Sequence, residues 1–289
     1  MSFQKAVKNT TGFGFLSRKG VGFRAKKGNM GKRVLVTGVS SGLGWALTEQ
    51  LLTRGDSVYG TSRRTPAQFE GHRNFHFIPM DLGELSSIGP NLEQLCRDIS
   101  WLDLVILNAG ALGSIADLRD VTVGEMKHLM NINVWSNKVL LDWLFQRGIK
   151  VAQVVAISSA VAVQPQRGWN GYALSKNALN TLMALYAAEV KEVHFSSISP
   201  GVIDTAMQDY VTNLTSDTRF FTVEMLKLMK GTPQMPPPEI AAGRILTACE
   251  TVTRLPSGGF ADLEDLAKIC APDPQSRLQE IVQRRRAAR

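Results

Sequence analysis

The chain has 289 residues, of which 44% are hydrophobic and 20% are charged, a balance typical of a soluble chain with one sizeable core. No run approaches the roughly 18 consecutive apolar residues that a membrane-spanning helix needs, and no apolar stretch near the start fits a secretory signal. We therefore expect a cytoplasmic protein with no membrane association. The three cysteines are far apart and odd in number, and although His72 and His76 stand four residues apart, no partner ligand is near them, so we predict no metal site and no disulfide framework.

The net charge of +8 would suit a nucleic-acid-binding protein if it were spread over the fold. However, residues 1–29 carry seven Lys and Arg without an acid, and the last residues carry four Arg. Removing these eleven charges from +8 leaves residues 30–283 at −3, so we expect no nucleic-acid partner for the folded body. Because residues 1–29 also lack a periodic apolar face, we predict a disordered basic tail. The same residues would also fit a transit peptide, or an extension upstream of a natural start at Met30.

The first ordered element is expected to be a strand at 33–37, which leads into a glycine-rich turn and a helical pattern at 45–52. The turn reads Thr37-Gly38-Val39-Ser40-Ser41-Gly42-Leu43-Gly44. Glycines allow a tight turn and a close approach to a pyrophosphate, whose charge the amides at the helix start would meet. Strand, glycine turn and helix in this order predict a dinucleotide site.

A second strand, expected at 57–63, ends where a dinucleotide fold contacts the adenosine ribose, roughly 20 residues beyond the glycines. Ser62 and Arg63 stand there, and no acid does. An acidic side chain would accept a hydrogen bond from a 2′-hydroxyl and repel a 2′-phosphate, whereas a hydroxyl beside a guanidinium suits the phosphate. The sequence therefore predicts NADP rather than NAD.

The rest of the chain alternates strands with helices. Strands are expected at 75–80, 104–107, 153–157, 194–199 and 260–263, and helices at 85–99, 123–145, 223–230 and 239–251. This alternation predicts an α/β fold of a single domain, a doubly wound parallel sheet of Rossmann type with helices on both faces. We assign residues 30–268 to this domain and 269–289 to a basic C-terminal tail. The proline-rich segment 204–238 is expected to be a substrate lid.

Tyr172 and Lys176 lie four residues apart in a helical segment, so their side chains share one face. A phenol has a pKa near ~10, and a fixed cation beside it favours the phenolate and lowers that pKa. We therefore expect Lys176 to lower the pKa of Tyr172 and make it an acid–base group. The alternative is a solvated pair on a helix surface.

The spacing Gly-x-x-x-Gly-x-Gly, followed by Tyr-x-x-x-Lys, resembles that of the short-chain dehydrogenase/reductase family. Matching motifs extend in the family's order from Thr37 to Thr205. The resemblance implies that the cofactor is contacted by Ser62, Arg63 and a further set of residues, together with six residues of the glycine turn: Gly38, Ser40, Ser41, Gly42, Leu43 and Gly44. The further set consists of Asp81, Leu82, Asn108, Ala109, Gly110, Tyr172, Lys176, Pro200, Gly201, Ile203 and Thr205.

The resemblance also implies a catalytic set of Asn133, Ser159, Tyr172 and Lys176. Ser159 stands thirteen residues before Tyr172, which is the family spacing, and it would orient the substrate oxygen. Asn133 would interrupt a regular helix and hold a water beside Lys176. Asn131 is close enough to be the alternative.

Within the family, segments 108–113, 204–208 and 257–262 look like the sepiapterin reductase and benzil reductase branch. The resemblance implies transfer of hydride from NADPH to a small-molecule carbonyl substrate, a ketone, diketone or pterin, by a homodimer or homotetramer. Alcohol oxidation remains an alternative. So does a non-catalytic NADP-sensing scaffold whose basic tails bind polyanions.

Two assignments concern the substrate itself. The large apolar residues that would line its pocket, or otherwise belong to the core, are Leu112, Trp135, Trp169 and Met207. Asp262 matches the position at which sepiapterin reductases anchor the aminopterin. Its alternative is a surface acid in the run that also contains Glu264 and Asp265.

Overall fold

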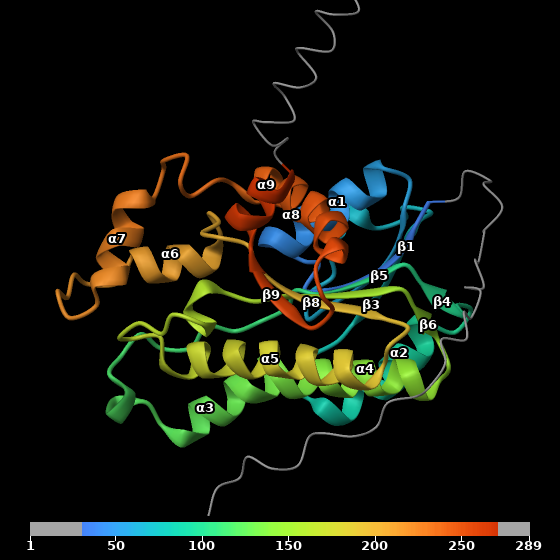
Figure 1. The fold of residues 1–289 in the computed structure, drawn as a ribbon, viewed down its shortest axis with the longest axis horizontal. Helices are drawn as coiled ribbons and strands as arrows, with labels where there is room; N and C mark the ends of the chain where they lie inside the picture. Colours follow the sequence, from blue (N-terminus) through green and yellow to red (C-terminus); the bar gives the residue numbers. More distant parts are fainter. Residues whose placement is uncertain (1–30, 271–289) are drawn as a thin grey trace, which may run out of the picture. The chain divides into compact units, whose positions relative to one another are not determined.

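The computed structural model describes residues 31–270; the predicted tail 1–29, and all but the first two residues of 269–289, lie outside them. The main strands are β1 Arg33–Thr37, β2 Ser57–Ser62, β3 Phe75–Pro79, β5 Leu104–Leu107, β7 Gln153–Ile157, β8 His194–Ser199 and β9 Gly259–Asp262. They form one parallel sheet in the order β3-β2-β1-β5-β7-β8-β9 (Figure 1). The predicted doubly wound sheet is therefore confirmed. A short parallel pair, β4 Trp101–Leu102 and β6 Lys150–Val151, was not predicted.

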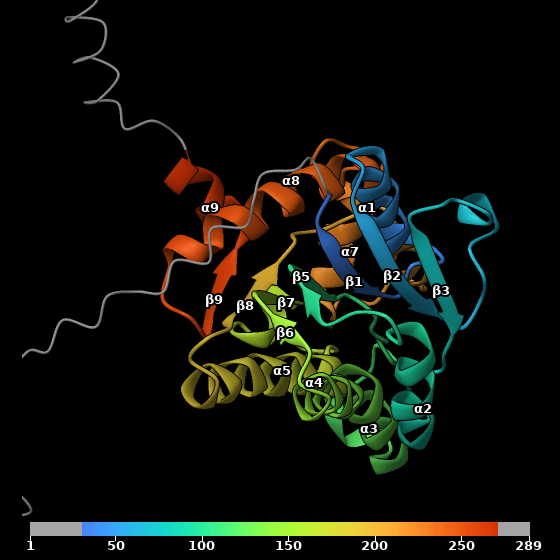
Figure 2. The same ribbon diagram turned by 90° about the vertical axis from the view of Figure 1, so that its right-hand side faces the viewer.

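Helices cover both faces of this sheet. They are α1 Gly42–Thr53, α2 Leu85–Leu95, α3 Val123–Met130, α4 Ser136–Gln146, α5 Asn170–Glu189, α6 Ala206–Thr212, α7 Phe221–Met229, α8 Pro238–Thr251 and α9 Leu263–Cys270. Helices α1, α8 and α9 lie on one face, and α2, α4 and α5 lie on the other (Figures 1 and 2). This arrangement is the doubly wound form that alternating elements predict.

The sheet separates two hydrophobic cores. Val34 and Val36 of β1 point into the core beneath α1 and α8, while Leu35 points into the core beneath α2, α4 and α5. Successive side chains of a strand face opposite sides, so every residue of a central strand is buried when both faces are covered. This is why β1 and β5 are apolar runs rather than alternating patterns.

One expected helix is interrupted, as the resemblance implied for Asn133, and two further helices were not expected from the sequence. The helix predicted at 123–145 is divided into α3, a π-helical turn at Asn131–Trp135, and α4. Helix α6 was missed because it is only seven residues long and lies in a segment with weak periodicity. Helix α9 was also missed; Glu264 and Asp265 are exposed, as a run of surface acids would be, and they occupy the first turn of this helix, where acidic side chains are favourable.

A third, smaller core joins α6 and α7 to the rest of the fold. Its buried members are Leu112, Trp169, Ala173, Val211, Phe220, Val223, Leu226 and Met235. Leu112 and Trp169 belong to loops that precede α3 and α5, whereas Val211 to Met235 belong to the predicted lid segment. The segment 204–238 is therefore packed against two loops rather than projecting from the fold.

Candidate active site

A cavity of about 570 Å³ opens at the carboxyl ends of β1, β2, β5, β7 and β8. In a doubly wound sheet this edge is where ligands bind, because the helices on the two faces diverge there. Every residue predicted from the sequence to contact the cofactor lies in the cavity wall. Segments that are far apart along the chain thus meet as the motif order predicted.

The glycine turn gives the cavity a wall of bare backbone. Gly38 and Gly42 have positive φ angles of 80° and 55°, which L side chains rarely adopt. A Cβ on Gly44 would lie 2.1 Å from the carbonyl oxygen of Gly38. The first turn of α1 carries no acid, and its amides lack intrahelical acceptors. This combination suits an anionic group such as a pyrophosphate.

Thr37 joins the start of the glycine turn to the end of β5, a role that sequence reasoning missed. Its hydroxyl oxygen accepts from the backbone amides of Asn108 and Ala109, at 3.0 Å each. The Asn108 amide group in turn donates to the Thr37 carbonyl oxygen at 2.9 Å. These bonds lock the ends of β1 and β5 together. The sequence placed Thr37 at the end of a strand and at the start of the glycine-turn motif, but nothing in the local sequence indicated its partners.

The ribose-side residues carry more positive charge than predicted. Arg63 and Arg64 are both exposed and both line the cavity, but sequence reasoning identified only Arg63. The Ser62 hydroxyl donates to the Arg64 carbonyl oxygen at 2.7 Å, so its proton is already engaged and it can only accept from a ligand. Two guanidiniums rather than a hydroxyl and one guanidinium are therefore the groups suited to a phosphate here.

Tyr172, Lys176 and Ser159 meet at the base of the cavity. Lys176 is 3% exposed; its ammonium donates to the Ile157 carbonyl oxygen at 2.7 Å and lies 5.7 Å from the centroid of the Tyr172 ring. Burial lowers the pKa of Lys176 to about 8. Burial also raises the pKa of Tyr172 to about 12, and the hydrogen bond with Ser159 opposes this only in part.

The expected lowering of the Tyr172 pKa is therefore wrong for this structure. Withdrawal of the phenolate from water outweighs the favourable contacts, and burial disfavours the charge of Lys176 as well. The phenol consequently stays neutral at neutral pH and keeps a proton that it can donate.

Asn133 lies in the π-helical turn, so the predicted interruption of the helix is confirmed. Its side-chain oxygen accepts from the Ala111 amide at 2.8 Å, and its nitrogen donates to the Ala111 carbonyl oxygen and the Ser175 hydroxyl at 2.9 Å each. It is fully buried and does not line the cavity. A Cβ on Gly110 would nevertheless lie 3.1 Å from the Asn133 oxygen and 3.4 Å from the Lys176 nitrogen, so both groups face the same glycine.

The substrate side of the cavity is mainly apolar. Of the predicted residues, Leu112, Trp169 and Met207 line it. Trp135, which is 42% exposed, and Asp262, which is paired with Ser199 through β9, do not. Among the wall residues that sequence reasoning did not identify are His128, Ile132, Val161, Gln208, Thr222 and Leu226.

Two negative findings apply to residues 31–270. In that part of the chain, no group of three or more His, Cys, Asp or Glu side chains is arranged to hold a metal ion. Within the same range, no helix is long and apolar enough to cross a membrane.

Known proteins of similar sequence and structure include reductases of one family. Over 247 residues, the chain is 29% identical to a benzil reductase ((S)-benzoin forming) of Bacillus subtilis. This alignment covers 80% of this chain and 98% of that protein. Over 270 residues, it is 30% identical to sepiapterin reductase of Bos taurus, covering 83% and 97% of the two chains. A crystal structure of a short chain dehydrogenases/reductase from Saccharomyces cerevisiae superposes with a TM-score of 0.73 at 23% identity, over 82% of this chain and 99% of that one. The family model for short chain dehydrogenase matches residues 32–215, and the chain belongs to this family of oxidoreductases.

Proposed function

We propose that the protein is an NADPH-dependent carbonyl reductase acting on an aromatic ketone or diketone. The observation that carries this proposal is the meeting of Tyr172, Ser159 and Lys176 with the apolar wall of Leu112, Trp169 and Met207 in one cavity. The similarity to a benzil reductase and to a sepiapterin reductase supports a carbonyl substrate. The absence of Asp262 from the cavity wall favours a diketone over a pterin.

NADPH, when bound, supplies the hydride that reaches the carbonyl carbon. Tyr172 donates its phenolic proton to the carbonyl oxygen, so that the two additions convert the carbonyl to an alcohol. A phenol is protonated at neutral pH even at its ordinary pKa of about 10, and burial raises the pKa of Tyr172 further. Ser159, which faces the phenol, holds the substrate oxygen in line with that proton. Lys176, whose ammonium lies near the Tyr172 ring, would favour the transient phenolate. The Asn133 side chain, which is bonded to Ala111 and Ser175, would hold the loop beside Lys176 in place.

The residues present fit a dinucleotide phosphate. The amides at the start of α1 would hold the pyrophosphate, and the wall without side chains at Gly38 and Gly44 leaves room for it. Arg63 and Arg64 would bind the 2′-phosphate by charge-assisted hydrogen bonds. The backbone of Ile203 would hold the nicotinamide carboxamide, and the hydroxyl of Thr205 would bond either that carboxamide or a phosphate.

Arg63→Asp should reverse the preference for NADPH over NADH. The substitution removes one phosphate ligand and places a carboxylate against the remaining negative charge, so kcat/KM with NADPH should fall at least tenfold, or about 1.4 kcal/mol. Arg73→Asp makes the same charge change at an exposed arginine that does not line the cavity, and it should leave the preference intact. Equal use of both cofactors by the parent protein would refute the assignment.

The substrate class is tested by a screen of aromatic diketones, pterins and sugars with NADPH, followed by nucleotide absorbance. We expect the highest kcat/KM for an aromatic diketone. Turnover confined to sugars would contradict an apolar site. No turnover with any carbonyl, despite NADPH binding, would favour the sensing scaffold.

Exposed apolar side chains support a homodimer or homotetramer. Trp135 at the end of the π-helical turn before α4, and Leu174 and Leu185 on α5, are 42%, 56% and 54% exposed. Such residues on neighbouring helices suit an interface between two copies. A monomer mass in analytical ultracentrifugation at micromolar concentration would exclude it.

A further inference from the structure

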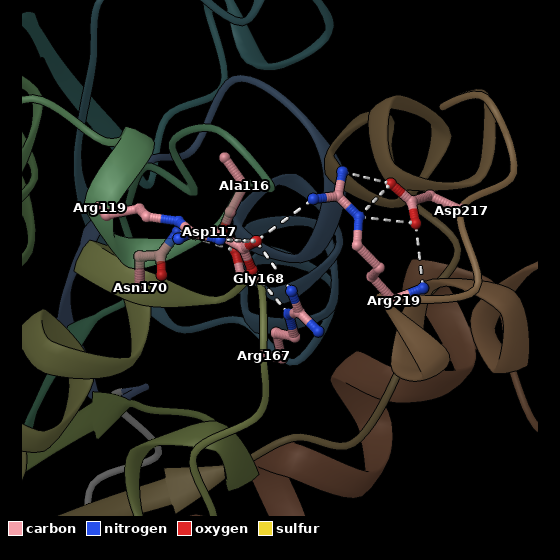
Figure 3. Close-up of polar contacts among 8 residues, drawn as sticks. All are labelled: Ala116, Asp117, Arg119, Arg167, Gly168, Asn170, Asp217 and Arg219. Atoms are coloured by element: carbon pink, nitrogen blue, oxygen red, sulfur yellow. Dashed lines mark hydrogen bonds and ion pairs between the residues drawn. The ribbon is translucent and has the colours of Figure 1, made fainter.

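A cluster of five charged residues lies beside the cavity but outside its wall. We name it the Asp117 cluster; its members are Asp117, Arg119, Arg167, Asp217 and Arg219 (Figure 3). The Asp117 side chain is only 9% exposed. A carboxylate this well shielded from water needs partners to remain charged, and the arginines around it supply them.

The partners of Asp117 come from two distant segments. Arg167, in the loop before α5, makes a bidentate contact through Nε at 2.6 Å and Nη2 at 2.8 Å. Arg219, directly before α7, donates from Nη1 at 3.3 Å. The opposite side of the Arg219 guanidinium is held by Asp217 at 2.7 Å. Figure 3 shows Arg167 and Arg219 reaching Asp117 from different directions.

Each of the three linked segments also supplies part of the cavity wall. The loop containing Asp117 provides Leu112, the loop containing Arg167 provides Trp169, and the helix that follows Arg219 provides Leu226. A change in the ion pairs would therefore move apolar wall residues relative to one another. The cluster is placed to fix the shape of the substrate side without touching the substrate.

Apolar packing transmits this restraint to the lid. The Arg219 guanidinium lies 5.2 Å from the centroid of the Phe220 ring, and Phe220 is buried in the third core beside Leu112 and Trp169. Gly168 has a φ of 95°, and a Cβ there would lie 2.8 Å from Phe220 Cδ1. Phe220 thus fits against bare backbone next to Arg167, and its ring also lies beside the Arg219 guanidinium.

We propose that Asp117 and Arg219 form an electrostatic latch that holds α6 and α7 against the substrate side of the cavity, and that Arg219 is a positioning residue for substrate affinity. The effect on substrate affinity rests on the proposed carbonyl reduction, whereas the contact between Asp117 and Arg219 and its effect on α6 and α7 do not. Arg219 is half-exposed, so the attraction is screened by salt and modest in size. A latch of this strength can release and reclose while the rest of the fold stays intact.

The latch also has a defined dependence on pH. The hydrogen bond from Arg167 is the main cause that lowers the pKa of Asp117, and the charges of Arg167, Arg219 and Arg119 add to it. Because the pKa of Asp117 is lower in the folded than in the unfolded protein, its ion pairs stabilise the fold fully at pH values above the unfolded-state pKa. This stabilisation is lost as the pH falls through the folded-state pKa. Asp217, whose pKa Arg219 lowers, follows the same direction. The latch is therefore fully formed at neutral pH.

Arg219→Gln tests the latch, and Arg119→Gln is its matched control. Arg119 also approaches Asp117, at 3.9 Å, but lies on the same loop and is 81% exposed, so its loss removes a charge without releasing the lid. At saturating NADPH, Arg219→Gln should raise the KM for an uncharged aromatic diketone about fivefold and change kcat by less than about twofold. Arg119→Gln should leave both near the parent values. Arg219→Lys keeps the charge and should recover part of the loss.

Hydrogen exchange measures the latch without catalysis. Amides of α6 and α7 should exchange faster in Arg219→Gln than in the parent or in Arg119→Gln, while those of β1 and β5 stay unchanged. Added salt should raise the parent KM and exchange rate but not those of Arg219→Gln. Parent-like KM and exchange in Arg219→Gln would overturn the latch. Faster exchange of α6 and α7 in a protein with no reductase activity would keep the latch and refute only the proposed function.

Discussion

Tyr172→Phe is expected to lower kcat at least a hundredfold, or about 2.7 kcal/mol of barrier, while NADPH binding stays close to that of the parent. The Tyr172 ring packs against the third core, and Phe preserves that packing. Only the hydroxyl beside Ser159 is lost, and with it the proton that the carbonyl oxygen receives. Steady-state rates with an aromatic diketone and a separate fluorescence titration of NADPH measure the two effects independently.

Tyr210→Phe is the matched control, because Tyr210 is 46% exposed on α6 and does not line the cavity. It should retain the parent kcat. If Tyr172→Phe keeps kcat within about tenfold of the parent, another group donates the proton and the assignment of Tyr172 is wrong. If NADPH binding falls together with kcat, the substitution has damaged the site rather than the chemistry.

Gly44→Ala is expected to lower the free energy of unfolding by about 1–3 kcal/mol and to weaken NADPH binding at least tenfold. The new Cβ would lie 2.1 Å from the Gly38 carbonyl oxygen and 2.5 Å from the Asn108 side-chain nitrogen. The glycine turn has to shift, and it carries the backbone that would hold the pyrophosphate. Urea unfolding and nucleotide titration measure the two losses.

Gly243→Ala provides the comparison within helix α8. The nearest atom to its new Cβ is Gln50 Oε1 at 3.4 Å, an ordinary contact, so the better helix propensity of alanine should leave stability unchanged or raise it by about 0.5–1 kcal/mol. Stability and NADPH affinity of Gly44→Ala equal to those of the parent would show that the turn accommodates a side chain.

Much of the fold follows from local patterns. The runs at 33–37, 104–107 and 153–157 became β1, β5 and β7 because a doubly covered sheet buries every residue of its central strands. Boundaries failed where tertiary contacts override propensity. Apolar periodicity alone predicted one continuous helix over 123–145, because the π-helical turn around Asn133 is bonded to Ala111 in another loop; the family resemblance, not the local pattern, placed the break at Asn133.

The sequence predicted the site residues that belong to motifs at the carboxyl ends of the strands. It did not predict the ion pairs between side chains that are far apart along the chain. Gly38, Ser159 and Tyr172 stand at fixed motif positions, and the topology alone brings them together. The contacts of Asp117 span 50 residues to Arg167 and 102 to Arg219. No periodicity or spacing indicates such partners. The direction of the Tyr172 pKa shift also depends on burial, which spacing does not reveal.

Transfer of deuterium from NADPH to the product tests the central claim most directly. The protein is incubated with an aromatic diketone and NADPH deuterated at the transferable nicotinamide position, and the product is analysed by mass spectrometry. The account predicts a hydroxyketone with one deuterium on the new carbinol carbon, formed faster with NADPH than with NADH. No hydroxyketone, or a hydroxyketone that carries no deuterium, would contradict hydride transfer to a carbonyl.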